Sequence, residues 1–339
     1  MTRPDGTSAE GRALPGSSAT GTRAGAGVPV AAAAGAAPAS PRPLSRRAFV
    51  AGAAALGASA LLSGCVDQYQ TTYDEDGNAV TRLIGTSVAV CEICDKLELN
   101  LVGIPTTDSD MPERYEGVTE VGTSMSPDME IVASLKPDYV ITPNSLLDDL
   151  QPKYAAISVA SIFLDLRSVP GMYDSISYLG QKFDRTEQSY ALVDEYEAVM
   201  EEYNASIADY EAPTVLVLMG LPGSYLVATE NSYAGSLVQL AGGVNVYEGE
   251  SDSDFLSINS EDMVTKDPDI ILRTAHALPD TVFAMFAEEF ETNDIWKHFR
   301  AVEEGRVYDL DYDLFGMSAK FNYPDALTAL KKILYEESA

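Results

Sequence analysis

SPDMEIVASLKPDYVIT, residues 126–142, combines the start of a helix, a Lys-Pro-Asp turn and an apolar strand. A second segment, NSEDMVTKDPDIILRT at residues 259–274, repeats this order with an Asp-Pro-Asp turn. Because the two segments lie far apart in the chain, the repeat favours two related halves. Strands that alternate with helices indicate βαβ units and a mainly parallel sheet. The sequence therefore predicts an α/β fold with two lobes and a ligand cleft between them.

The remaining pattern extends this alternation to both sides. Further strands are expected at residues 83–90, 102–106, 157–166, 214–220, 225–230, 245–247 and 306–311. Further helices are expected at residues 92–101, 234–241, 294–302 and 324–337. The longest helical pattern runs from about Gly171 to Tyr210, and its apolar positions form one stripe at Leu192, Tyr196, Val199, Tyr203 and Ile207. An uninterrupted helix of about 30 residues would be roughly 40 Å long and could join the lobes.

These patterns divide the chain into five parts. Residues 1–64 form a disordered leader with an export signal, and residues 65–81 a flexible linker. The N-terminal lobe is expected at 82–170, the linking helix at 171–211 and the C-terminal lobe at 212–339.

The leader carries signals for export and lipid attachment. Arg46-Arg47 is similar to a twin-arginine signal, and the apolar stretch Ala48–Leu62 is too short to span a bilayer comfortably. Leu62-Ser63-Gly64-Cys65 is similar to a bacterial lipobox, in which the Cys is lipidated. We expect the mature protein on the outer face of the cytoplasmic membrane, anchored through Cys65. The alternative is a plain signal-anchor helix with an incidental cysteine.

The composition excludes several classes of function. A net charge of −30 repels nucleic acid, so a nucleic-acid-binding role is not expected. With two histidines and three cysteines, the chain cannot build a zinc site from several histidines or a cluster on four thiolates. Phosphate-binding loops and Ser-His-Asp arrangements do not stand out.

His276 and Met125 are the two residues expected at the ligand site. His276 directly follows the strand in residues 269–274, and ligands of open α/β sheets lie beyond the carboxyl ends of the strands. Met125 precedes a helix with Ser126 as the expected N-cap. His276 could instead be a hydrogen-bonded loop residue, and Met125 a hydrophobic contact of its helix. An imidazole facing a thioether, however, forms a good axial pair for haem iron.

Residues 82–337 resemble solute-binding proteins of ABC transporters that have two lobes joined by one long helix. Within that class they are most similar to the haem-receptor lipoproteins of iron-regulated surface determinant systems. The segments that carry the resemblance are EICDKLELNLVGIPTT, PERYEGVTEVGTSMSPDMEIVASLKPDYVI, MGLPGSYLVATENSYAGSLVQLAGGVNV and INSEDMVTKDPDIILRTAHALP. The resemblance implies that Met125 and His276 bind the iron of a transported haem. It also implies a monomer that is not an enzyme, with an ABC permease, its ATPase and an upstream haem donor as partners.

One loop departs from this family. After VGIP the family tends to offer a lysine toward the haem propionates, whereas residues 106–112 read TTDSDMP. The propionates would then be bound by backbone amides or by a more distant base.

Other readings of the sequence stay open. The same scaffold could bind a ferric siderophore or a corrinoid. Cys91 and Cys94 form a CxxC pair at a strand-to-helix junction, which could serve a thiol oxidoreductase, form a disulfide or remain as buried thiols. His298 is expected on the surface. Residues that could line the pocket, or pack in the core, are Tyr225, Tyr233 and Met317.

Overall fold

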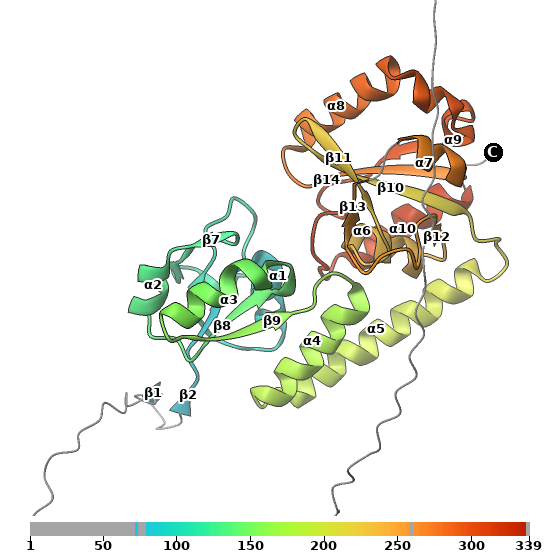
Figure 1. Cartoon of the computed structure of the whole chain (residues 1–339). Helices are drawn as coiled ribbons and strands as arrows, with labels where there is room; N and C mark the ends of the chain where they lie inside the picture. Colours follow the sequence, from blue (N-terminus) through green and yellow to red (C-terminus); the bar gives the residue numbers. More distant parts are fainter. Residues whose placement is uncertain (1–71, 74–78, 258–259, 337–339) are drawn as a thin grey trace, which may run out of the picture. The chain divides into compact units, whose positions relative to one another are not determined.

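The computed structural model describes residues 72–73, 79–257 and 260–336, and residues 68–339 form one compact unit (Figure 1). The leader, the twin-arginine pair and Cys65 lie outside the described residues. Within the described part, no helix is long and apolar enough to cross a membrane. The predicted α/β fold is confirmed: the structure contains two separate multi-stranded sheets with helices packed on them.

The N-terminal sheet is parallel throughout, with the strand order β5-β4-β3-β8-β9. Its strands are β3 (Leu83–Gly85), β4 (Leu101–Ile104), β5 (Thr119–Glu120), β8 (Tyr139–Pro143) and β9 (Ala160–Leu164). Its helices are α1 (Val88–Lys96), α2 (Met129–Ser134) and α3 (Leu147–Ala156), with short 3-10 turns at Glu113–Tyr115 and Asn144–Leu146. Two small antiparallel pairs accompany it: β1 (Thr72–Tyr73) with β2 (Ala79–Val80), and β6 (Gly122–Thr123) with β7 (Ser126–Pro127).

Alternation along the strands places helices on both faces of this sheet. Leu83 packs with α1 in one hydrophobic cluster, whereas its neighbour Ile84 packs with α2 and α3 in another. Val140 and Ile141 divide between the same two clusters. Because successive side chains of a strand point to opposite faces, a short apolar run can serve both cores. This explains why the buried strands read as continuous apolar runs.

The C-terminal sheet has six strands in the order β13-β11-β10-β14-β15, with β12 also paired to β10. Strands β10, β12, β14 and β15 are parallel, whereas β11 and β13 are antiparallel to their neighbours. The strands are β10 (Thr214–Leu221), β11 (Ser224–Ala228), β12 (Val244–Asn245), β13 (Phe255–Leu256), β14 (Ile270–Ala275) and β15 (Val307–Asp309). The helices are α6 (Tyr233–Leu240), α7 (Ser260–Lys266), α8 (Pro279–Thr292), α9 (Arg300–Glu303) and α10 (Tyr323–Lys331), with short helical turns at Asp294–His298 and Lys332–Glu336.

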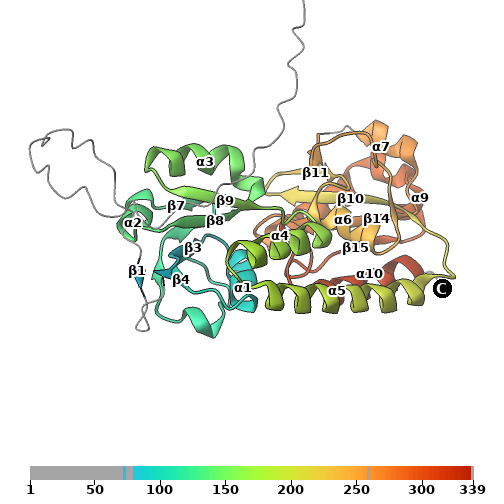
Figure 2. The ribbon, with the colours of Figure 1, turned by 90° about the horizontal axis from the view of Figure 1, so that it is seen from below.

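The segment expected to be one linking helix is two helices, α4 (Val169–Lys182) and α5 (Thr186–Ile207), which pack against each other (Figure 2). The chain turns at Asp184, whose φ of 57° lies in the left-handed region and ends helical geometry. Gly180 allows the close packing, because a Cβ there would lie 2.4 Å from the Ser189 hydroxyl. The 22 residues of α5 extend about 33 Å.

Helix α5 contacts both parts of the molecule. Near its start, the Gln188 side-chain amide donates to the carboxylate of Glu98, which follows α1, at 3.1 Å. Near its end, the Tyr203 hydroxyl donates to the Ala241 carbonyl, after α6, at 3.3 Å. The predicted apolar stripe of α5 packs on the main core. Helix α5 contacts both parts, although it is shorter than the expected helix.

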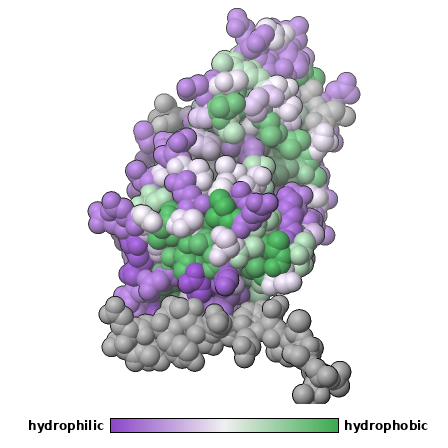
Figure 3. Space-filling model, turned by 90° about the vertical axis from the view of Figure 1, so that its left-hand side faces the viewer, coloured by the Kyte–Doolittle hydropathy of each residue, from purple (hydrophilic) through white to green (hydrophobic). Residues whose placement is uncertain are grey.

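Several predicted boundaries were wrong. The strand expected at residues 83–90 stops at Gly85, because the Ser87 side chain accepts from the Val90 amide and begins α1. Helices α3 and α8 were not predicted. They follow the carboxyl ends of β8 and β14, respectively. On the face in Figure 3, hydrophobic residues gather in patches between hydrophilic ones.

Candidate functional site

His276 is held at the carboxyl end of β14, a central strand of the C-terminal sheet. Its backbone amide donates to the Gly220 carbonyl at 3.0 Å, which continues the β10–β14 pairing by one residue. The ring is half-buried, and its Nδ1 is enclosed with no hydrogen-bond partner among the described residues. The backbone pairing therefore fixes where the imidazole starts, at the carboxyl end of β14, and Nδ1 is the enclosed nitrogen of its ring.

Met125 lies in a different setting, in the two-residue turn of the β6–β7 hairpin. Its side chain is 65% exposed, the highest value among the large apolar residues that the structure describes. The expected N-cap at Ser126 was wrong: Ser126 pairs with Thr123, and the helix begins after Asp128. The Asp128 carboxylate accepts from the amides of Glu130 and Ile131, at 2.9 and 3.1 Å. Met125 is thus a hairpin residue and not the hydrophobic contact of a helix start.

The three additional pocket residues lie in packed surroundings. Tyr225 donates to Glu289 at 3.2 Å and packs on Phe286, and burial raises the pKa of its phenol to about 12. Tyr233 is 2% exposed at the start of α6, and Met317 packs against the main core. Their surroundings suit core packing. Tyr225 pairs in register with Gly220 of β10 and so lies across that strand from the His276 amide.

Cys91 and Cys94 are buried free thiols on α1. Desolvation by burial raises the pKa of both, that of Cys94 to about 12. A thiol oxidoreductase needs an accessible thiolate, which these surroundings disfavour. His298 is exposed, as expected. Within the described part of the chain, no group of three or more His, Cys, Asp or Glu residues could hold a bare metal ion.

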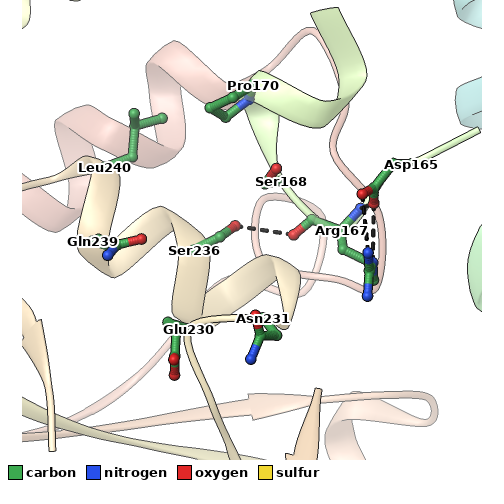
Figure 4. Close-up of a pocket in the computed structure, with 9 residues that line it drawn as sticks. All are labelled: Asp165, Arg167, Ser168, Pro170, Glu230, Asn231, Ser236, Gln239 and Leu240. Carbon is green, nitrogen blue, oxygen red and sulfur yellow. Dashed lines mark hydrogen bonds and ion pairs between the residues drawn. The ribbon is translucent and has the colours of Figure 1, made fainter. Parts of the chain in front are cut away.

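A cluster of ion pairs and hydrogen bonds around Arg167 connects the end of β9 to the C-terminal part (Figure 4). It was not predicted from the sequence. The Arg167 guanidinium contacts Asp165 at 3.0 Å and Asp254 at 3.3 Å, and the Ser236 hydroxyl donates to the Arg167 carbonyl at 3.0 Å. The guanidinium holds the pKa of Asp165 below its usual value. Asp165, Arg167 and Ser236, together with Glu230, line a pocket of about 380 Å³. An arginine directly after a predicted strand in a strongly acidic chain was the available signal.

Three pockets can be compared with the positions of the two predicted iron ligands. Besides the pocket at Arg167, one lies between α1 and residues 320–322, and another between α5 and α10. Neither Met125 nor His276 lines any of the three. Met125 and His276 instead share a position directly after or soon after a strand. Met125 follows β6 of the hairpin, and His276 follows β14 of the C-terminal sheet.

Comparison with known proteins decides the family. The family described as "Periplasmic binding protein" matches residues 84–314. The chain is also 40% identical over 278 residues to the high-affinity heme uptake system protein IsdE of Staphylococcus aureus strain Newman, covering 82% of this chain and 94% of IsdE. The chain belongs to the periplasmic binding protein family. It is therefore an extracytoplasmic binding protein and not an enzyme.

Solved structures of similar proteins share this fold of the periplasmic binding protein family. An ABC transporter substrate-binding protein from Listeria monocytogenes EGD-e is 46% identical, with a TM-score of 0.73 over 76% of this chain and 100% of that one. S. aureus IsdE complexed with heme is 42% identical, with a TM-score of 0.71 over 76% of this chain and 99% of that one. The similarity therefore extends across both sheets and the helices that connect them.

Proposed function

We propose that this chain binds haem outside the cytoplasm and delivers it to an ABC import permease and its ATPase for iron acquisition. The observation that carries the proposal is the 42% identity and matching fold with IsdE complexed with heme. Haem is the transported cargo here and not a resident cofactor. No group of three or more His, Cys, Asp or Glu residues among the described residues could hold an uncomplexed metal ion, which favours a ligand whose iron is already bound by a porphyrin.

We assign the iron ligands to His276 and Met125. With Nδ1 of His276 enclosed, Nε2 is the nitrogen available to an iron, and its strand-end position provides a fixed point of attachment. The Met125 thioether is exposed on a hairpin turn and needs no core contact to break before it can bind. Imidazole and thioether together hold low-spin haem iron. Both ligands are neutral, which suits a carrier that must later release its cargo.

The processing and partners belong to the same proposal. Export by the twin-arginine route and a lipid on Cys65 would hold the protein on the outer face of the cytoplasmic membrane. The working unit is then a monomer with an N-terminal lobe at 82–170, a linking segment at 171–211 and a C-terminal lobe at 212–339. An upstream haem donor would supply it.

Titration of residues 66–339, the mature chain without its lipidated Cys65, with haemin tests the proposal. We expect saturation at one haem per chain and a sharp low-spin Soret band. A ferric siderophore and a corrinoid serve as competing ligands in the same assay, and we expect neither to displace haem. Saturable binding of either ligand, with only weak and unsaturated haem absorbance, would contradict the proposal.

A further inference from the structure

Leu278 combines two unfavourable features. Its side chain is 63% exposed, and its backbone adopts φ 48° and ψ 57°, in the left-handed region. Leucine rarely adopts this conformation, because its Cβ then crowds the following carbonyl. A glycine at this position would avoid both the crowding and the exposed apolar surface. Neither local backbone preference nor core packing explains why a leucine is present.

The surrounding structure imposes this conformation. The Leu278 carbonyl accepts from the amides of Thr281 and Val282 and so opens α8. Helix α8 in turn packs tightly on β10, because a Cβ at Gly220 would lie 2.3 Å from Val282 and 2.7 Å from Phe286. The same Gly220 carbonyl anchors His276. The start of α8 thus fixes the backbone of Leu278, two residues after the proposed iron ligand.

Other exposed large apolar side chains share its place beyond strand ends. Met125 is 65% exposed, and Leu147 and Tyr312 are 36% and 39% exposed after β8 and β15. Leu278 follows β14, so Leu278 and Tyr312 follow strands of the C-terminal sheet, Leu147 follows a strand of the N-terminal sheet, and Met125 lies in the separate β6–β7 hairpin. Ligands of α/β sheets lie beyond the carboxyl ends of the strands, and exposed apolar side chains at such positions indicate a surface that the ligand covers.

We propose that Leu278 packs against the porphyrin of haem on the His276 side and thereby sets how long haem is retained. This proposal rests on the proposed function. Backbone strain persists at a site when the surrounding structure over-determines it, and burial of the leucine side chain against the apolar macrocycle offsets that strain only when haem is bound. The strained leucine thus stabilises the loaded protein and does not stabilise the empty one.

Three variants of Leu278 separate a ligand contact from a structural role. Leu278→Gly removes both strain and side chain, Leu278→Ala removes the side chain alone, and Leu278→Met keeps an apolar side chain. We expect the Gly and Ala variants to lose haem to apomyoglobin about tenfold faster than the unmodified protein, and the Met variant at nearly its rate. The melting temperature of the haem-free Gly variant should equal or exceed that of the unmodified protein.

Two controls and one spectrum complete the test. Ser158→Gly relieves a similar φ of 57° before the amino end of β9, and Tyr190→Ala removes a side chain that is 60% exposed on α5. Neither should change haem release. If the Gly and Ala variants melt lower without haem and release haem at the unmodified rate, the inference is wrong. A failed proposed function looks different, because the unmodified protein would then give no low-spin haem spectrum at all.

Discussion

The two proposed iron ligands sit in opposite kinds of local structure. His276 continues the pairing of β14 with β10 and is half-buried. Helix α8 follows it and packs on the same two strands. Met125 stands 65% exposed in the turn of a hairpin whose strands have two residues each. The first ligand is positioned by the sheet and the second only by a small local hairpin. We infer that His276 provides a rigid attachment and Met125 an adjustable one.

This contrast suits a protein that must bind haem and then give it up. A ligand whose backbone is already fixed by strand pairing limits the entropy lost on binding. An adjustable ligand can leave the iron without disturbing a core. Release would then begin on the Met125 side.

The largest expected effect is loss of the rigid ligand. We expect His276→Ala to weaken haem binding by on the order of 100-fold or more, because no second imidazole lies at a described strand end. Haemin titration followed at the Soret band measures this change. His298→Ala is the matched control and should bind haem like the unmodified protein. Equal losses in both variants would show that the histidine assignment is wrong.

Loss of the adjustable ligand should cost less. We expect Met125→Ala to weaken haem binding about tenfold and to convert the spectrum from low-spin to high-spin, because the imidazole alone leaves one axial position open. Haem release should accelerate more than haem capture slows. An unchanged low-spin spectrum would remove Met125 from the coordination sphere, and a loss as large as that of His276→Ala would abolish the contrast between the two ligands.

The hairpin beneath Met125 allows a finer test. Gly122 has a φ of +96°, and a Cβ there would lie 2.9 Å from the Ser126 carbonyl oxygen. Gly122→Ala should therefore distort the turn and weaken haem binding a few-fold, with about 1 kcal/mol lost from folding stability. Gly117→Ala is the control, because φ is +76° there but nothing lies within 4 Å.

A double variant tests whether the hairpin affects haem binding only through Met125. Gly122→Ala combined with Met125→Ala should bind haem no more weakly than Met125→Ala alone, because the hairpin acts through the thioether. Fully additive losses would mean that the hairpin contacts haem by another route.

The smallest effect is expected at the cysteines, which test whether a strand-end position is sufficient for function. Cys91 and Cys94 lie on α1 just beyond β3, but they are buried. Because burial raises the pKa of both thiols, that of Cys94 to about 12, neither forms a thiolate at pH 8. A thiol-reactive dye should label them only after unfolding. Rapid labelling of the folded protein, or insulin reduction, would contradict this reading.

The sequence predicted those elements whose signal is local. Strands β8, β10 and β14 are rich in apolar residues, and α5 has an apolar stripe. The turn between α4 and α5 escaped prediction because it depends on the left-handed conformation of Asp184 and on packing between Gly180 and Ser189. Pro152 lies inside α3 and reads as a helix breaker.

The candidate site shows the same division. His276 was predictable because it directly follows a strong strand signal. The hairpin at Met125 was not, because Ser126 and Pro127 suit the start of a helix, and only pairing with Gly122 and Thr123 assigns them to a strand. Leu278 was unremarkable in sequence, since neither its exposure nor its φ can be read from residue type.

The near-infrared charge-transfer band of the ferric haem complex tests the central claim most directly, because its position reports which two side chains bind the iron. We predict the band of an imidazole–thioether pair for the mature chain and its loss in both His276→Ala and Met125→Ala. A band of any other ligand pair, or one that survives both substitutions, would contradict the assignment of His276 and Met125.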